Sequence, residues 1–207
     1  MIIAVDGPAA SGKGTVARAL ANHYGLPHLD TGLLYRAVGI ATLRGGGDPT
    51  SEADAIEACA FSDAMLADPG LRSEAAAAAA SVVSAFPAVR ARLLERQREF
   101  GLQEGGAVLD GRDIGTVVMP QATAKLFVTA RPAVRAQRRY DELTRMGMEV
   151  HYESVLTDIL ARDERDAGRS AAPLRRADDA ALLDTSEMGI DEAVQRAISL
   201  VEARIRQ

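Results

Sequence analysis

IIAVDGPAASGKGT, at residues 2–15, sets the architecture of this 207-residue chain. Four consecutive apolar residues without polar alternation predict a strand buried on both faces. The glycines that follow let backbone N–H groups approach phosphate oxygens, and a helix starting near Lys13 adds its positive N-terminal end. The Lys13 ammonium would reach the β- and γ-phosphates of a nucleotide. The stretch is therefore interpreted as a phosphate-binding loop, made of Gly7, Pro8, Ala9, Ala10, Ser11, Gly12, Lys13, Gly14 and Thr15.

The hydroxyl residue of this loop is displaced by one position. The common pattern puts Ser or Thr directly after the lysine, whereas here Gly14 follows Lys13 and the hydroxyl comes at Thr15. The G-K-G-T sequence resembles nucleoside monophosphate kinases, in which we expect Mg²⁺ to be held mainly through phosphate and water. The alternative is a glycine-rich turn that only joins a strand to a helix. Lysine usage argues against that alternative, because Lys13 and Lys125 are the only lysines among 24 basic residues.

Composition limits the class of protein. The net charge of −5 argues against a nucleic-acid-binding surface, and 47% hydrophobic with 26% charged residues is ordinary for a soluble globular domain. The single cysteine, Cys59, excludes an intramolecular disulfide and favours a reducing compartment. The three histidines show no metal-ligand spacing, and no run approaches 18 apolar residues. We expect a cytoplasmic, monomeric enzyme with no nucleic-acid or membrane partner.

Short apolar segments alternate with helical patterns along the whole chain. Strands are predicted at 2–5, 26–29, 107–110, 125–129 and 181–185. Helices are predicted at 16–24, 73–85, 88–100, from Pro132 to Gly147, at 152–166 and at 190–205. The alternation predicts an α/β fold of the P-loop NTPase type, a three-layer sandwich with a five-stranded parallel sheet and helices on both faces. The alanine run 75–80 is interpreted as a closely packed helix. The last helix is expected to turn Ile190, Val194, Ala197, Ile198 and Val201 inward.

Polar segments follow the first three strands, at residues 7–15, 30–36 and 110–113. Because ligands bind at the carboxyl edge of an open parallel sheet, these segments form the candidate site. Transfer of a phosphoryl group to another phosphate needs no general base, but it needs cations around two anionic groups. Arginine meets phosphate bidentately, although any one arginine could equally be a solvated surface group. The candidates near predicted loops and helix ends are Arg36, Arg90, Arg112, Arg162 and Arg169, with Asp113 and Asp166 among them.

Several motifs resemble those of bacterial cytidylate kinases, which pass the terminal phosphate of ATP to CMP or dCMP. Beyond G-K-G-T they are DTG with YR at 30–36, Ser81 followed by Phe86-Pro87 and Arg90, DGRDIGT at 110–116, and RDERD at 162–166 with Arg169 and APL at 172–174. These motifs span nearly the whole chain, and DGRD and RDxRD are specific to this family among monophosphate kinases. The resemblance implies ATP and Mg²⁺ as cofactors and CMP or dCMP as the acceptor.

The resemblance also implies residue roles. Lys13 and the loop amides would hold the ATP phosphates, Arg36 and Arg112 would grip the acceptor phosphate, and Thr31 would support it. Ser81, Arg90 and Asp113 would read the cytosine edge, Arg162 and Asp166 would hold the sugar, and Arg169 would approach the phosphates. Two alternatives stay open: Asp113 as a structural partner of a neighbouring arginine, and Ser81 as a packing residue. The implied catalytic residues are Lys13, Arg36, Arg112, Arg162 and Arg169. The implied substrate-binding residues are Thr31, Arg36, Ser81, Arg90, Arg112, Asp113, Arg162, Asp166 and Arg169.

The resemblance divides residues 1–207, a single kinase domain, into functional parts. The core is expected at about 1–38, 86–139 and 166–207, the monophosphate-binding lobe at 39–85 and a short lid at 140–165. Long members of the family carry a small antiparallel sheet before the serine that corresponds to Ser81. In this chain that sheet is predicted to be shortened or missing, because residues 62–73 contain no run of alternating β-branched residues. Arg135 and Arg139, one helical turn apart, could face ATP when the lid closes or could form a solvated stripe.

Two rival functions stay open at this point. One is a kinase for another monophosphate or a small metabolite, although adenylate kinases usually have a longer lid. The other is a P-loop switch that binds nucleotide and signals to a partner. The absence of an N-K-x-D guanine-reading motif argues against the switch.

Overall fold

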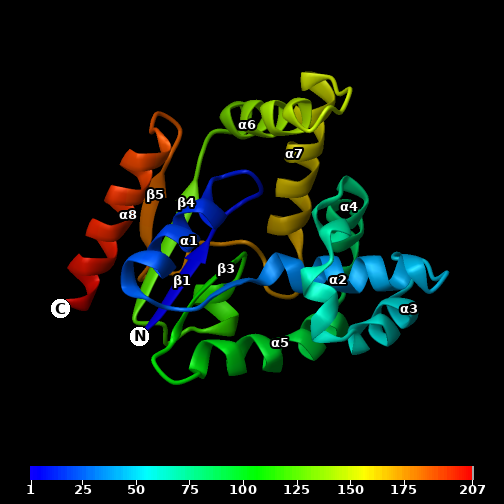
Figure 1. Cartoon of the computed structure of the whole chain (residues 1–207), viewed down its shortest axis with the longest axis horizontal. Coiled ribbons are helices and arrows are strands. Elements are labelled where there is room, and N and C mark those ends of the chain that lie inside the picture. The colour runs from blue at the N-terminus through cyan, green and yellow to red at the C-terminus, as the bar shows by residue number, and fades with distance from the viewer. Residues whose placement is uncertain (207) are drawn as a thin grey trace. The chain divides into compact units, whose positions relative to one another are not determined.

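The computed structural model describes residues 1–206, which form two compact units. The first unit comprises residues 1–28 and 101–206, and the second comprises residues 29–100. Figure 1 shows the order of the elements along the chain. The helices are α1 (Lys13–Tyr24), α2 (Thr31–Arg44), α3 (Glu52–Glu57), α4 (Glu74–Val83), α5 (Pro87–Leu102), α6 (Pro132–Arg145), α7 (Tyr152–Gly168) and α8 (Ile190–Ile205). The strands are β1 (Ile2–Asp6), β2 (His28–Asp30), β3 (Ala107–Gly111), β4 (Ala124–Thr129) and β5 (Ala181–Asp184).

The five strands form one sheet in the order β2-β3-β1-β4-β5. The pairs of β1 with β3, β1 with β4, and β4 with β5 are parallel. Val5 lies opposite Asp110 on one side and Leu126 on the other, so the ends of β1 and β3 coincide. The predicted α/β fold with a five-stranded parallel sheet is confirmed.

Strand β2 begins two residues later than predicted. Gly25 takes a left-handed conformation with φ 64° at the end of α1, and its N–H donates to the Ala21 carbonyl. The Leu26 N–H donates to the same carbonyl at 2.9 Å, so Leu26 still belongs to the helix cap. The chain is free to extend only after that cap.

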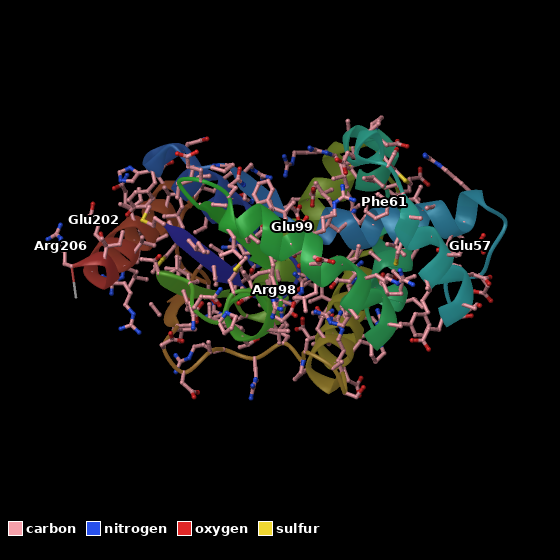
Figure 2. All side chains as sticks on the ribbon, turned by 90° about the horizontal axis from the view of Figure 1, so that it is seen from below. Glu57, Phe61, Arg98, Glu99, Glu202 and Arg206 are labelled. Carbon is pink, nitrogen blue, oxygen red and sulfur yellow. The ribbon has the colours of Figure 1, made fainter. Side chains whose placement is uncertain are left out.

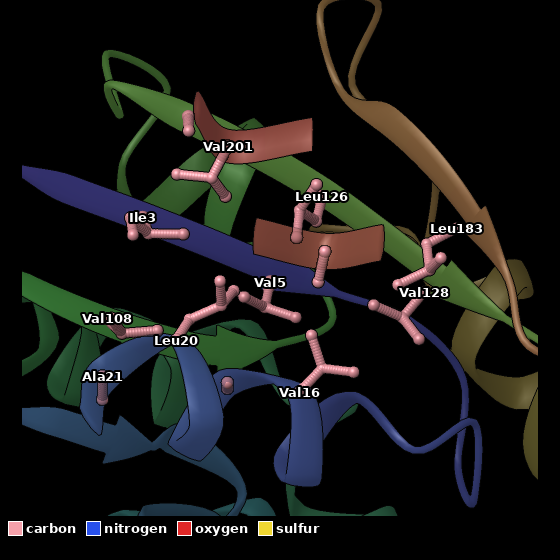
Figure 3. Close-up of a cluster of buried hydrophobic side chains, with 13 residues drawn as sticks. Ile3, Val5, Val16, Leu20, Ala21, Val108, Leu126, Val128, Leu183 and Val201 are labelled. Atoms are coloured by element: carbon pink, nitrogen blue, oxygen red, sulfur yellow. The ribbon is translucent and has the colours of Figure 1, made fainter. Parts of the chain in front are cut away.

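The core of the first unit is an apolar cluster between the sheet and two helices (Figure 3). Its members come from β1, β3, β4 and β5, from α1, and from α8. They are Ile3, Val5, Val16, Ala17, Leu20, Ala21, Val108, Ala124, Leu126, Val128, Leu183, Ala197 and Val201. Burial on both faces explains why residues 2–5 of β1 are a continuous apolar run.

The inward stripe of α8 differs from the prediction at one end. Ala193, Ala197 and Val201, spaced by four residues, are the buried members, whereas Ile190 is 70% exposed at the first helical position. Figure 2 shows the other end of this helix, where Arg206 Nη2 donates to Glu202 Oε2 at 3.1 Å. That pair is exposed, as expected for the solvent side of a terminal turn.

In the second unit α2 packs against α4, and small residues make the contact possible. A Cβ atom on Gly39 would lie 2.7 Å from the Cβ of Ala79, so the two helices approach closely at this point. Ala76, Ala77 and Ala79 are buried, and Ser73 caps α4 by accepting from the Ala76 N–H at 3.1 Å. The prediction that the alanine run forms a closely packed helix is confirmed.

Residues 63–72 form two short 3₁₀ helices, Asp63–Ala67 and Pro69–Arg72. The second is started by Asp68, whose side chain accepts from the Gly70 N–H at 2.7 Å, and by Pro69 in its first turn. Among residues 1–206 no single helix is long and apolar enough to cross a membrane, and α4 with α5, bent by 105° at the break between them, passes that test only as a pair.

Candidate phosphoryl-transfer site

The loop between β1 and α1 has a backbone conformation that requires glycine at Gly7 and Gly12. A Cβ atom on Gly7 would lie 2.0 Å from the Val128 carbonyl oxygen on the neighbouring strand. Gly12, the residue that precedes α1, has φ 87°, in the left-handed region that favours glycine. Ala10 adopts φ 57° without that freedom. The glycines therefore let the loop pass close to the sheet and then turn its amides toward the start of α1.

Ser11, at the centre of the loop, is fully buried, and its hydroxyl has no hydrogen-bond partner among residues 1–206. A buried hydroxyl is normally satisfied, so an unsatisfied one marks a place where a bound group completes the bonding. The Ser11 carbonyl, in contrast, accepts from Thr185 Oγ1 at 3.1 Å. Arg138 Nη1 donates to that same Thr185 hydroxyl at 2.9 Å. The loop backbone is held from behind, while the donor atom of Ser11 is suited to an anionic oxygen.

Lys13 lies beside Asp110, the fourth residue of β3. Its Nζ is 4.0 Å from Asp110 Oδ1, and the carboxylate is 2% exposed. The other oxygen, Oδ2, is 2.7 Å from His28 Nε2. Sequence reasoning had Asp110 only as part of the DGRD motif and gave His28 no role. The sequence did contain an indication that Asp110 belongs to the site. Asp110 follows directly after the apolar run 107–109, on a strand that pairs with β1.

Asp6, the last residue of β1, is a second carboxylate that sequence reasoning did not single out. Its two oxygens accept from the Ile114 N–H and the Gly115 N–H, each at 2.7 Å. These amides follow directly after Arg112 and Asp113 and begin a short π-helical segment, Ile114–Val118. Burial raises the pKa of Asp6 to about 7, with the two amides opposing the shift. Asp6 therefore fixes the backbone that carries the DGRD side chains.

Three of the predicted residues form one cluster in the first unit. Asp166 on α7 is 4% exposed and accepts from Arg112 Nε at 2.8 Å. Arg169 Nη2 donates to the other oxygen of the same carboxylate. Burial alone would raise the pKa of Asp166, but Arg112, Arg169 and Arg162 together lower it below its ordinary value. The carboxylate is thus ionised and holds two guanidinium groups in fixed positions.

Asp113 is 4% exposed and its carbonyl accepts from the N–H groups of Val117 at 2.8 Å and Val118 at 3.1 Å. Its charge contributes to the raised pKa of Asp6. Its backbone caps the π-helical segment, and its role in reading the base stays a prediction.

Thr31, Arg36, Ser81 and Arg90 lie in the second unit, residues 29–100. Thr31 is buried at the first position of α2, and Arg36 Nη1 donates to the Leu71 carbonyl at 2.8 Å. Arg90 is buried; its Nη1 donates to the Ser84 carbonyl at 3.2 Å, and its guanidinium carbon is 5.3 Å from the centre of the Tyr35 ring. Ser81 is half-buried on α4. Tyr35 was quoted only as part of a motif, and the contact gives it a specific role in orienting Arg90.

The solvated-stripe interpretation is wrong for Arg135, which is 3% exposed and bonded to Asp163 of α7. Arg139 bonds Glu142 on its own helix at 2.6 Å. Arg135 lies at a point where α6 and α7 pack together, so it could not have been assigned from helical periodicity alone.

The chain matches one known protein family over almost its whole length. The family model for cytidylate kinase matches residues 3–203. A cytidylate kinase of Xanthobacter autotrophicus is 60% identical over 205 residues, which is 99% of this chain and 98% of that protein. The chain belongs to the cytidylate kinase family. A second member, from Azorhizobium caulinodans, is 57% identical over 203 residues and covers 98% of each chain.

As a cytidylate kinase, the chain is a nucleoside monophosphate kinase whose family implies the use of ATP. A solved structure of a sugar kinase from Janibacter sp. HTCC2649 is similar in fold, with a TM-score of 0.52 at 15% identity over 99% of this chain and 96% of that one. Membership of the cytidylate kinase family excludes the rival interpretation as a P-loop switch.

Proposed function

We propose that the cytidylate kinase reaction takes place on the first unit, with the γ-phosphate of Mg-ATP on the 7–15 loop and the phosphate of CMP or dCMP on the arginine cluster. The observation that carries this proposal is the Arg112–Asp166–Arg169 cluster in the same compact unit as the phosphate loop. Two arginines against one carboxylate leave a net positive charge, which suits an anionic acceptor.

On the donor side, the loop amides, the Ser11 hydroxyl and Lys13 would bind the β- and γ-phosphates. The unsatisfied Ser11 hydroxyl and the helix start at Lys13, whose preceding Gly12 makes no side-chain cap, support this role. Asp110 and His28 would keep the Lys13 ammonium near the loop. Mg²⁺, held mainly through phosphate oxygens and water, would supply further charge neutralisation.

On the acceptor side, no general base is needed, because a phosphate oxygen of the monophosphate is already anionic near neutral pH. The residues would position the acceptor and neutralise charge as it develops. Asp166 limits the rotamers of Arg112 and Arg169, so less motion is lost when the phosphate binds. Thr31 and Arg36 would support the same phosphate, and Arg162 with Asp166 would hold the sugar.

The cytosine would be read by Ser81, Arg90 and Asp113. A carboxylate accepts from the exocyclic amine that cytosine has and uracil lacks, and arginine donates to the ring carbonyl and nitrogen. The cation–π contact with Tyr35 would hold the Arg90 guanidinium in one orientation. We further propose a monomeric, cytoplasmic enzyme with a monophosphate-binding lobe at 39–85 and a short lid at 140–165.

The test of these roles is a comparison of KM values in two variants. Arg112→Ala should raise KM for CMP by about tenfold or more and leave KM for ATP within about twofold, because the proposal assigns Arg112 to the acceptor phosphate and not to ATP. Arg206→Ala, at the exposed end of α8, is the matched control and should match the wild type. Equal increases in both KM values for Arg112→Ala would remove the assignment of Arg112 to the acceptor.

A further inference from the structure

A single buried arginine joins three segments of the first unit. Arg135 Nε donates to the Ala130 carbonyl at 2.8 Å, just before α6. Its Nη1 donates to the Ala9 carbonyl of the phosphate loop at 3.1 Å and to Asp163 Oδ1 on α7 at 2.9 Å. Its Nη2 donates to Asp163 Oδ2, so the pair with the carboxylate is bidentate. The planar fork of arginine makes all these bonds at once, which lysine could not do.

The loop side of this junction depends on the helices. Ala9 is 8% exposed and belongs to an apolar cluster with Ala136 and Leu143 of α6 and with Val155 and Ile159 of α7. The next residue, Ala10, is a non-glycine residue at φ 57°. A residue in that conformation persists only where its surroundings hold it. The cluster and the Arg135 bond are the contacts that hold the loop at Ala9.

The helix side of the junction continues to the acceptor cluster. Asp163 and Asp166 are three residues apart on α7, so they lie on neighbouring turns of one helix face. Asp163 binds the arginine that holds the phosphate loop, and Asp166 binds Arg112 and Arg169. One helix is thereby tied to the donor loop through Arg135 and to the acceptor arginines through Asp166.

We propose that Arg135 is a positioning residue which, with Asp163, couples nucleotide binding on the phosphate loop to acceptor binding at the Arg112 cluster through α7. The inference rests on the proposed roles of that loop and that cluster. A nucleotide that orders the loop fixes Ala9, Arg135 and Asp163, and thereby the position of α7. The acceptor then binds to arginines whose partner carboxylate is already in place. By linkage, the acceptor must raise nucleotide affinity by the same factor.

The test measures that coupling on the full chain by calorimetry. The Kd of CMP is determined alone and in the presence of saturating Mg²⁺ with a non-hydrolysable ATP analogue, and their ratio is the coupling factor. We expect the wild type to show a factor of about five or more, in the usual range for coupled sites. Asp163→Asn should bring the factor close to one while CMP binding alone changes little. Arg135→Lys should also bring the coupling factor close to one. The double variant should have the same coupling factor as either single variant, because both changes break the same junction.

The matched control is Glu187→Gln. Glu187 pairs with Arg131, which precedes α6, the helix that carries Arg135. Both side chains are exposed, and their ion pair involves neither the phosphate loop nor α7. This variant should keep the wild-type coupling factor, and thermal unfolding shows whether each variant is folded. The inference would be overturned if Asp163→Asn kept the wild-type coupling factor. It would also be overturned if the Kd of CMP for the wild type were the same with and without the ATP analogue. A wild type that binds the analogue but no CMP would overturn both the proposed acceptor roles and the inference.

Discussion

Replacement of Asp6 by asparagine separates the charge of this carboxyl from its shape. The side chain ends β1 and accepts from the Ile114 and Gly115 N–H groups at 2.7 Å each. Burial is the largest cause that raises the pKa of Asp6 from 3.8 to about 7, with the charge of Asp113 acting in the same direction. The two amides and Arg112 oppose the shift without cancelling it. In the folded chain the carboxyl therefore takes up a proton at a pH where the unfolded chain has already lost it.

The sign of the pH dependence follows from proton binding. Between about pH 4 and about pH 7 the folded state binds more protons at Asp6 than the unfolded state does, so the free energy of unfolding falls as pH rises through this window. Above it the contribution is constant. The shift from 3.8 to about 7 is about three units, which at 1.36 kcal/mol per unit is about 4 kcal/mol across the whole window. Asparagine does not titrate, so the wild type should lose up to that amount relative to Asp6→Asn.

The assay is urea unfolding of both proteins in matched buffers from about pH 5 to about pH 8, where most of the window lies. The control is Asp184→Asn. Asp184 is exposed, and its bonds from the Ser186 hydroxyl and N–H lower its pKa from 3.8, so its stabilising contribution is lost only as pH falls below about 4. Between about pH 5 and about pH 8 the Asp184→Asn and wild-type curves should therefore run parallel. Wild-type and Asp6→Asn curves that run parallel over the whole range would refute the assignment of a raised pKa to Asp6.

Three further outcomes follow from the same contacts. Lys13→Ala should lower kcat by about a hundredfold or more in a chain that still unfolds cooperatively, because the lysine stabilises charge that develops in transfer, and steady-state rates with calorimetric melting check this. Asp113→Asn should erode the preference for CMP over UMP more than it changes KM for ATP, as competing kcat/KM values would reveal; an unchanged ratio would remove Asp113 from base reading. Gly39→Ala should destabilise the chain by about 1–3 kcal/mol in urea, because its Cβ would lie 2.7 Å from that of Ala79; an unchanged midpoint would mean that α2 and α4 can separate freely.

The sheet and its helices could be predicted because their signals are local. The apolar runs at β1 and β3, the end of α1 at Tyr24 and the helical alanine run each depend on a few neighbouring residues, and the structure has each of them near the predicted place. Errors occurred where a cap or a tertiary contact decides the outcome. Leu26 is held by the cap of α1, and Ile190 is exposed because the buried stripe of α8 starts at Ala193.

Asp6 and Arg135, which support the site, could not be predicted from the sequence for a different reason. The phosphate loop carries its own signature, so Lys13 could be named from that motif. Arg112 and Asp166 could be named because DGRD and RDxRD resemble motifs of a known family. Asp6 and Arg135 form hydrogen bonds with backbone groups. Because almost every residue has the same backbone N–H and carbonyl, such partners cannot be recognised from residue type. Asp6 meets Ile114 across 108 positions of sequence, and Arg135 meets Ala9 across 126. Only the fold brings such groups within bonding distance.

As a cytidylate kinase, this chain is expected to transfer the γ-phosphoryl group of ATP to a cytidine monophosphate. The most direct measurement is ADP formation from Mg-ATP with CMP, dCMP, UMP, AMP, GMP and dTMP in separate reactions, using Lys13→Ala as the blank. We expect turnover largely confined to CMP and dCMP. Turnover with CMP no higher than in the blank, from a chain that still binds ATP, would contradict it.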